Sequence, residues 1–166
     1  ARGMTLEGVT AGLIGTLAGR RVAFLARELE SKRPLLPREL PDDPLLMEVL
    51  ETMRACARQP QESLGAYVIS MAKSASDVLA VHLLQRECAV SPPLRVVPLF
   101  ETLDDLTHAG EVIGSLLAVP WYRAACRGEQ EVMIGYSDST KEAGRVASGW
   151  ALFRAQEDVV AKCKQV

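Results

Sequence analysis

The sequence is poor in aromatic side chains and has no block of basic residues. Aromatic residues make up only 5% of the 166 residues, so a core has to be built mainly from leucine, valine and alanine. The 19 basic and 21 acidic residues give a formal net charge of -2. This charge pattern argues against nucleic acid as the main partner. With 48% hydrophobic and 24% charged residues, the chain can fold as one domain or as part of a larger one.

Paired cysteine motifs and long apolar runs are also absent. The cysteines are scattered without a Cys-x-x-Cys pair, which predicts reduced thiols in a cytoplasmic protein. His82 and His108 have no matching ligands for zinc, and we interpret both as structural. The first apolar run, residues 9–18, is shorter than the about 20 residues that a membrane span needs. No glycine-rich phosphate loop of either common pattern is present. The cysteines are Cys56, Cys88, Cys126 and Cys163.

Helical patterns dominate the first third of the chain. Apolar residues three or four apart predict a helix over residues 6–32, which four glycines weaken. Four prolines within residues 34–44 predict an extended loop. Asp43 followed by Pro44 is typical of the N-cap and first position of a helix. Four side chains of that helix are expected to point inward: Leu46, Val49, Leu50 and Met53.

From residue 65 onward, β-favouring runs alternate with helical patterns. Strands are predicted over residues 66–72, 95–100 and 131–136. A helix that opens at Ser76 and Asp77 and helices over residues 103–119 and 141–166 follow them. Continuous apolar strands suit a parallel sheet that is covered on both faces, and a strand spacing of about 29 and 36 residues is close to that of a (β/α)8 barrel. We therefore predict an α/β fold, a helix-rich, partial TIM-barrel-like core of about three βα units.

Two carboxylates follow successive predicted strands. Glu101 closes the run RVVPLFE, and Asp138 lies in the turn of MIGYSDSTKEAGR. Because parallel strands about 4.8 Å apart end at the same edge of a sheet, both side chains can converge on one cation. Magnesium typically takes one or two carboxylates together with water and substrate oxygens. A metal site is one interpretation of this pair, and helix caps or surface acids are the other.

The residues beside Asp138 offer further candidates. Lys141 lies in the first turn of the predicted helix, where the helix dipole disfavours a cation, so it either faces an anion or is a surface lysine. Ser139 and Glu142 form the S-x-x-E pattern of a capping box. Arg145 follows Lys141 by one helical turn and should share its face. Arg95 and Arg145 could bind an anionic substrate or pair with nearby acids.

Three long stretches, in this order and spacing, closely resemble the phosphoenolpyruvate carboxylase family: SLGAYVISMAKSASDVLAVHLLQREC, VVPLFETLDDL and GYSDSTKEAGR. The stretches KRPLLPRELP and AQEDVVAKC are also similar to that family. The resemblance runs from about Leu29 to Val166. It divides the chain into residues 1–28, a helical segment without convincing resemblance, and residues 29–166, a part of the family's barrel domain.

The resemblance implies carboxylation of phosphoenolpyruvate by bicarbonate to oxaloacetate and phosphate, through carboxyphosphate and a metal-stabilised enolate. This is an anaplerotic carbon fixation that feeds the tricarboxylic acid cycle. Glu101 and Asp138 would hold the divalent metal, Mg²⁺ or Mn²⁺, and Lys141 would lie beside it, where bicarbonate and carboxyphosphate are handled. The family resemblance also implies a (β/α)8 barrel and a homotetramer. Thr140 stands where the family usually has Gly or Ala. Its branched side chain could shift Lys141, and we expect it to tune the activity and not to abolish it.

The family's catalytic histidine and its His-Gly-Arg-Gly-Gly loop are missing from the sequence. We therefore expect an internal fragment of the catalytic core, inactive and poorly folded by itself. The alternative is a short protein without carboxylase activity that acts as an interaction module of the parent enzyme. A third possibility, another metal-dependent lyase on the same barrel type, would need a phosphate-binding loop of its own.

Overall fold

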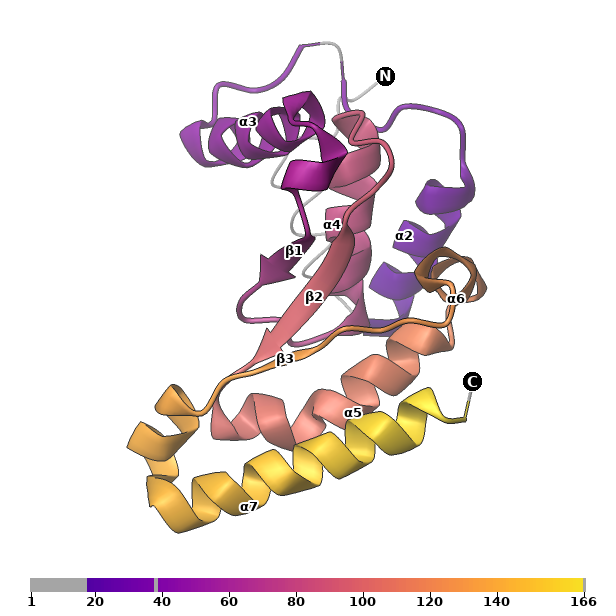
Figure 1. The fold of residues 1–166 in the computed structure, drawn as a ribbon. Helices are drawn as coiled ribbons and strands as arrows, with labels where there is room; N and C mark the ends of the chain where they lie inside the picture. Colours follow the sequence, from indigo (N-terminus) through magenta and orange to yellow (C-terminus); the bar gives the residue numbers. More distant parts are fainter. Residues whose placement is uncertain (1–17, 38, 166) are drawn as a thin grey trace.

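The computed structural model describes residues 18–37 and 39–165, in which helices outnumber strands (Figure 1). Their elements follow in the order α2 (Ala18–Glu30), α3 (Pro44–Arg58), the 3-10 helix η1 (Gln61–Ser63), β1 (Ala66–Ile69), α4 (Ala75–Glu87), β2 (Arg95–Phe100), α5 (Leu103–Leu117), α6 (Pro120–Cys126), β3 (Met133–Ile134) and α7 (Ser137–Cys163). The helix predicted over residues 6–32 is confirmed over α2, and its earlier part lies outside the described residues. Helix α6 was not predicted. None of the described helices is both long and apolar enough to span a membrane.

The three strands form a parallel sheet in the order β1-β2-β3. Val68 pairs with Val97, and Leu99 pairs with Met133. The predicted succession of three βα units with a parallel sheet is therefore confirmed. Two strands are shorter than predicted. β1 ends at Ile69 because the chain turns at Met71, whose φ of 56° is left-handed. β3 has only two residues because it pairs only with the last two residues of β2.

One face of the sheet carries the core. Val96 and Phe100 of β2 are at most 2% exposed and pack against the helices. Helices α5 and α7 run side by side, and α2 packs along α4 (Figure 1). Aliphatic side chains supply most of this core, as the shortage of aromatic residues predicted. The largest fully buried members on the helices include Leu25, Leu79, Leu106, Ile113 and Leu116. Burying each such side chain contributes about 1.5–3 kcal/mol.

The opposite face of the sheet is apolar but partly open. Side chains alternate along a strand, so Val68, Val97, Leu99 and Met133 share this face. Val68 is 44% exposed and Met133 43% exposed. The described residues thus form an open three-stranded sheet, and the closed barrel that the resemblance implies stays a prediction.

Helix α2 belongs to the same packed unit as the rest of the sheet's helices. Leu25 is only 2% exposed. The Arg86 guanidinium of α4 donates hydrogen bonds to the backbone oxygens of Glu28 and Ser31, at the carboxyl end of α2. An ion pair of 3.3 Å joins Arg21 to Asp77. These contacts fix α2 against α4, although most of α2 lies before Leu29, where the resemblance starts.

The cap predicted for the second helix is confirmed. Asp43 Oδ1 accepts hydrogen bonds from the N–H groups of Leu45 and Leu46, and Pro44 is the first helical residue. Of the side chains expected to point inward, Leu50 and Met53 are buried and Leu46 is half-buried. The prediction is wrong for Val49, which is 42% exposed.

Candidate active site

Glu101 lies in the short connection between a buried strand and a firmly capped helix. β2 ends at Phe100 and α5 begins at Leu103. Thr102 caps that helix: its Oγ1 accepts the N–H of Asp105 at 3.1 Å, and Asp105 Oδ2 accepts the N–H of Thr102 at 3.2 Å. Both sides of Glu101 are therefore fixed, and the residue is half-buried directly after the carboxyl end of β2.

Two backbone hydrogen bonds join the end of β3 to the end of β2. The N–H of Gly135 donates to the Phe100 carbonyl at 2.8 Å, and the N–H of Ser139 donates to the Glu101 carbonyl at 3.0 Å. Asp138 directly precedes Ser139 in the first turn of α7. The structure thus brings the backbones of the two predicted acids together at one edge of the sheet. The helix dipole favours the Asp138 carboxylate at this position.

Gly135 allows this close approach. A Cβ on residue 135 would stand 2.8 Å from the Cβ of Glu101 and 3.4 Å from its Cα. Real side chains do not approach so closely without displacement of a neighbour. The sequence interpretation did not single out Gly135, although a glycine between a strand and a polar turn is a known signal for close backbone approach.

Lys141 contacts one of the two acids, Asp138. Its Nζ donates to Asp138 Oδ1 at 2.9 Å, and its side chain is 76% exposed. The pKa of Lys141 is raised, first by the hydrogen bond from its ammonium to Asp138 and then by the negative charges of Asp138 and Glu101. One ammonium is therefore within electrostatic range of two carboxylates. The helix was predicted to begin at residue 141, but α7 begins at Ser137. Lys141 therefore lies beyond the first turn, where the helix dipole opposes a cation less.

The capping box predicted for Ser139 and Glu142 is wrong. Helix α7 begins two residues before Ser139, and its N-cap, Tyr136, makes no side-chain cap. The Ser139 hydroxyl instead lies 2.7 Å from the hydroxyl of Ser148. Glu142 reaches across to α5, where its Oε2 accepts the N–H of Leu103 at 3.1 Å. Glu142 thus ties the turn that carries Asp138 to the helix that follows Glu101.

Helix α7 is bent at Gly144, whose φ of 77° and ψ of 169° are not helical. This bend breaks the one-turn relation between Lys141 and Arg145, so the prediction that they share a helical face is wrong.

Arg95 lies at the amino end of β2 and pairs with Glu131 at 3.3 Å. The Thr140 hydroxyl donates to the Ser148 hydroxyl, and the Lys141 ammonium beside it donates to Asp138.

The two histidines have packing or surface surroundings. His82 is buried in α4, and its ring meets the rings of Trp121 and Tyr122 edge-on at 5.6 Å each. Burial lowers the pKa of His82 to about 4, so the ring is neutral at physiological pH. His108 is exposed in α5, with Nδ1 3.3 Å from Asp104 Oδ1. These positions agree with the structural interpretation of both residues.

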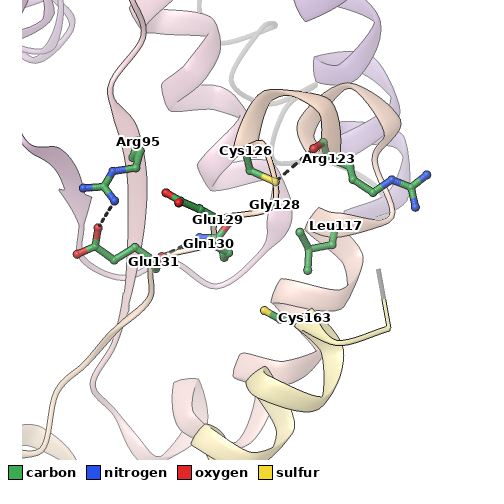
Figure 2. Close-up of a pocket in the computed structure, with 9 residues that line it drawn as sticks. All are labelled: Arg95, Leu117, Arg123, Cys126, Gly128, Glu129, Gln130, Glu131 and Cys163. Carbon is green, nitrogen blue, oxygen red and sulfur yellow. Dashed lines mark hydrogen bonds and ion pairs between the residues drawn. The ribbon is translucent and has the colours of Figure 1, made fainter.

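A hollow of about 600 Å³ lies between residues of β2, α6 and the carboxyl end of α7. Figure 2 shows the residues that line it. It opens near the amino end of β2, where Arg95 and Glu131 face one another, and Cys126 and Cys163 line it. Glu101 and Asp138 do not line this hollow. All four cysteines of the chain are free thiols. This hollow is therefore separate from the predicted metal site.

Glu101 and Asp138 are the two predicted metal ligands, and the hydrogen bond from the Ser139 N–H to the Glu101 carbonyl joins their parts of the backbone. Within residues 18–37 and 39–165, no three His, Cys, Asp or Glu side chains are grouped in a way that could bind a metal ion. Any ion at this edge would therefore take its remaining ligands from water, from a substrate or from residues outside the described part. Such a mixed ligand set is what Mg²⁺ commonly has.

Comparison with known proteins decides between the families that could carry such a site. The family model described as phosphoenolpyruvate carboxylase matches residues 16–166. The chain belongs to the phosphoenolpyruvate carboxylase family. It is 57% identical to "Phosphoenolpyruvate carboxylase 1" of Chlamydomonas reinhardtii over 141 residues, which are 85% of this chain and 14% of that protein. It is 56% identical to the phosphoenolpyruvate carboxylase of Pseudomonas putida over 146 residues, 88% of this chain and 17% of that protein.

The chain thus spans about one-sixth of the length of the curated carboxylases that it matches. A third relative, from Histophilus somni, is 55% identical over 144 residues, 87% of this chain and 16% of that protein. The family match begins at residue 16, earlier than the resemblance that started at Leu29. This earlier start agrees with the packing of α2 against α4.

Proposed function

We propose that this chain forms part of the catalytic centre of a phosphoenolpyruvate carboxylase and contributes its divalent metal site. The complete enzyme would join bicarbonate to phosphoenolpyruvate and release oxaloacetate and phosphate. The observation that carries the proposal is the hydrogen bond from the Ser139 N–H to the Glu101 carbonyl, because it fixes the turn of Asp138 against the end of the neighbouring strand. Membership of the family supplies the reaction.

The residues at this edge fit a divalent cation. Two carboxylates and one ammonium leave a net charge of -1, which attracts a cation, and carboxylate oxygens are the ligands that Mg²⁺ and Mn²⁺ prefer. The missing side chain of Gly135 lets the chain lie directly against Glu101. We propose Mg²⁺ or Mn²⁺ as the ion, held by Glu101 and Asp138. When bound, such an ion supplies electrostatic stabilisation of negative charge that develops on substrate oxygens.

Lys141 would bind the anionic substrates beside these acids. A lysine side chain is protonated at neutral pH, and the neighbouring acids raise the pKa of Lys141 further, so it presents a positive charge and up to three N–H donors. Its exposed position leaves the donors that do not contact Asp138 accessible to bicarbonate or phosphate oxygens. Donors that are fixed where charge develops lower the barrier of a reaction because they need no reorganisation.

We also propose that the three strands belong to a closed (β/α)8 barrel in the complete protein. The partly exposed apolar side chains of Val68 and Met133 support this proposal, because further strands would bury them in a barrel interior. The family resemblance supports a cytoplasmic homotetramer that supplies oxaloacetate to the tricarboxylic acid cycle.

The test uses a full-length relative in which this chain's stretch replaces the matching one. Glu101→Gln and Asp138→Asn should each lower metal-dependent turnover at least about a thousandfold, because each removes a charged ligand of the ion. Both should also weaken Mn²⁺ binding, measured by electron paramagnetic resonance. Glu157→Gln, which removes an exposed acid elsewhere on α7, is the matched control and should leave both properties unchanged. Near-normal turnover in either site variant would contradict the proposal.

A further inference from the structure

Three hydroxyl groups join the two segments of α7 on either side of the Gly144 bend. The Oγ atoms of Ser139 and Ser148 are 2.7 Å apart, and Thr140 Oγ1 donates to Ser148 Oγ at 3.1 Å. Ser139 is 0% exposed and Ser148 is 1% exposed. These hydrogen bonds are therefore shielded from competition with water, and breaking one would leave a buried hydroxyl without its partner.

The protons of these hydroxyls have one consistent order. Thr140 donates to Ser148, and Ser139 donates to the Tyr136 carbonyl at 3.3 Å. Each hydroxyl carries a single proton, so Ser139 has none left for Ser148. In that order the short contact between the two serines is a donation from Ser148 to Ser139, one of the two directions that its geometry allows. The chain of donors runs from Thr140 through Ser148 and Ser139 to the Tyr136 carbonyl.

The bend at Gly144 makes this contact possible. In a straight helix, residues nine positions apart are separated by about 13.5 Å along the axis, far beyond hydrogen-bond distance. Gly144, with its φ of 77° and ψ of 169°, turns the chain so that Ser148 returns to Ser139. This region of backbone conformation is essentially restricted to glycine. The bend and the hydroxyl contact therefore depend on one another.

Ser139 also connects the hydroxyls to both predicted metal ligands. Its N–H donates to the Glu101 carbonyl at 3.0 Å, and it directly follows Asp138. Its hydroxyl is anchored by Ser148, which lies in the long segment of α7 that packs on α5. A displacement of Ser139 would change the separation of Glu101 and Asp138.

We propose that Ser139 and Ser148 are positioning residues that set the spacing between Glu101 and Asp138 for a divalent cation. The inference rests on the proposed function of these two acids. Magnesium requires its oxygen ligands at about 2.0–2.1 Å in near-octahedral order, so its affinity depends on this spacing. Loss of the Ser148 hydroxyl should weaken metal binding while the groups that contact the substrates stay in place.

The test compares Ser148→Ala with Thr52→Ala in a full-length relative that carries this chain's stretch. Thr52 also has a hydroxyl bonded inside a helix, to the Glu48 carbonyl of α3, but it is exposed and belongs to a different helix. For Ser148→Ala, the dissociation constant of Mn²⁺, measured without substrates by electron paramagnetic resonance, should rise about fivefold, the effect of one hydrogen bond. The kcat at saturating Mn²⁺ should change less than twofold. Thr52→Ala should change neither value.

A second pair of variants tests whether the serines act as one unit. Ser139→Ala and the double variant with Ser148→Ala should weaken Mn²⁺ binding by similar factors, because either change breaks the same contact. Thr140→Val keeps the shape of residue 140 and removes only its hydroxyl, the first donor of the chain. It should weaken Mn²⁺ binding by about twofold. This variant replaces the serine variants in the test if they do not fold. Multiplied effects of the two serine variants would overturn the inference.

The outcomes separate this inference from the proposed function. If Ser148→Ala lowers the midpoint of thermal unfolding but leaves Mn²⁺ affinity unchanged, the serines are structural and the inference is overturned. If Glu101→Gln and Asp138→Asn also leave Mn²⁺ binding unchanged, the metal site itself is overturned. Weakened binding in both acid variants together with unchanged binding in Ser148→Ala would retain the site and reject the positioning role.

Discussion

Gly135 lies against Glu101 so closely that a Cβ on residue 135 would stand 2.8 Å from the Glu101 Cβ. The first prediction is that Gly135→Ala lowers metal-dependent turnover by at least about tenfold. The added methyl group has to push Glu101 away or lengthen the hydrogen bond from residue 135 to the Phe100 carbonyl. Overpacking of this kind typically costs about 1–3 kcal/mol. Steady-state kinetics at varied Mn²⁺ concentration in a full-length carboxylase measures the loss.

Gly149→Ala is the matched control for this substitution. Gly149 lies in α7, and no heavy atom outside its own helix backbone would lie within 4 Å of an added Cβ. Alanine is more favourable than glycine inside a helix by up to about 1 kcal/mol, so this variant should be as stable as the parent or more stable. Full activity in Gly135→Ala would show that the close approach to Glu101 has no role in the site.

The second prediction concerns the ammonium of Lys141. Lys141→Gln should lower kcat/KM for bicarbonate by at least about tenfold, because the variant keeps hydrogen-bond donors but loses the positive charge that strengthens hydrogen bonds to an anion. It should not weaken Mn²⁺ binding, since the variant frees Asp138 Oδ1 from its contact with Nζ. Lys164→Gln, at the far end of α7, controls for the loss of one positive charge. Unchanged kinetics in Lys141→Gln would remove Lys141 from the site.

The edge of the sheet that carries the acids was predictable from local patterns. The run Arg95–Phe100 is a strand with the predicted bounds, and Thr102 and Asp105 then start a helix with a capping box. The position of Glu101 follows from these two local signals. The placement of Asp138 beside it follows from the parallel order of the strands, which alternating strand and helix patterns predict.

The contacts that hold the turn of Asp138 were not predictable in the same way. Glu142 bonds to Leu103, 39 residues away in the sequence, so a local motif assigned it to a cap that does not form. The hydroxyl of Ser148 meets Ser139 only because Gly144 bends the helix. A glycine inside a helical pattern indicates lower helix stability, but it does not indicate the direction in which the chain turns.

The third prediction is a loss of stability at acidic pH that depends on His82. Burial lowers the pKa of His82 to about 4, so the folded protein favours the neutral ring. Between about pH 6.5 and pH 4 the unfolded chain binds the proton and the folded chain does not. The contribution of the neutral ring is therefore fully present above this window and is lost as pH falls through it. The loss is about 2 kcal/mol at pH 5.

His82→Phe tests this prediction because phenylalanine keeps a ring between Trp121 and Tyr122 but cannot bind a proton. In a full-length relative that carries this chain's stretch, the parent and the His82→Phe variant should unfold at similar temperatures at pH 7.5. At pH 5 the parent should unfold at a lower temperature than the variant. An equal shift of both proteins between the two pH values would mean that His82 does not carry the acid sensitivity.

The last prediction concerns the outer face of α7. Ala155 and Val159 are buried on its inner side, whereas the outer side carries an apolar stripe of Val146, Trp150, Phe153 and Val160, which are 89%, 66%, 51% and 49% exposed. The Trp150 and Phe153 rings are 5.7 Å apart. A helix that is apolar on opposite sides is typical of a buried helix with two partners. The isolated 166-residue chain should therefore self-associate, since a second copy can cover this stripe.

Sedimentation velocity of the isolated chain and its Trp150→Glu variant measures this association. The parent should sediment as large and heterogeneous species, and Trp150→Glu should shift the distribution toward the monomer because a charge disfavours burial of the stripe. Gln156→Glu adds the same charge at an exposed polar position of α7 and should leave the distribution unchanged. A soluble parent monomer that melts cooperatively would contradict the prediction, because the stripe would then be stable in water without a partner.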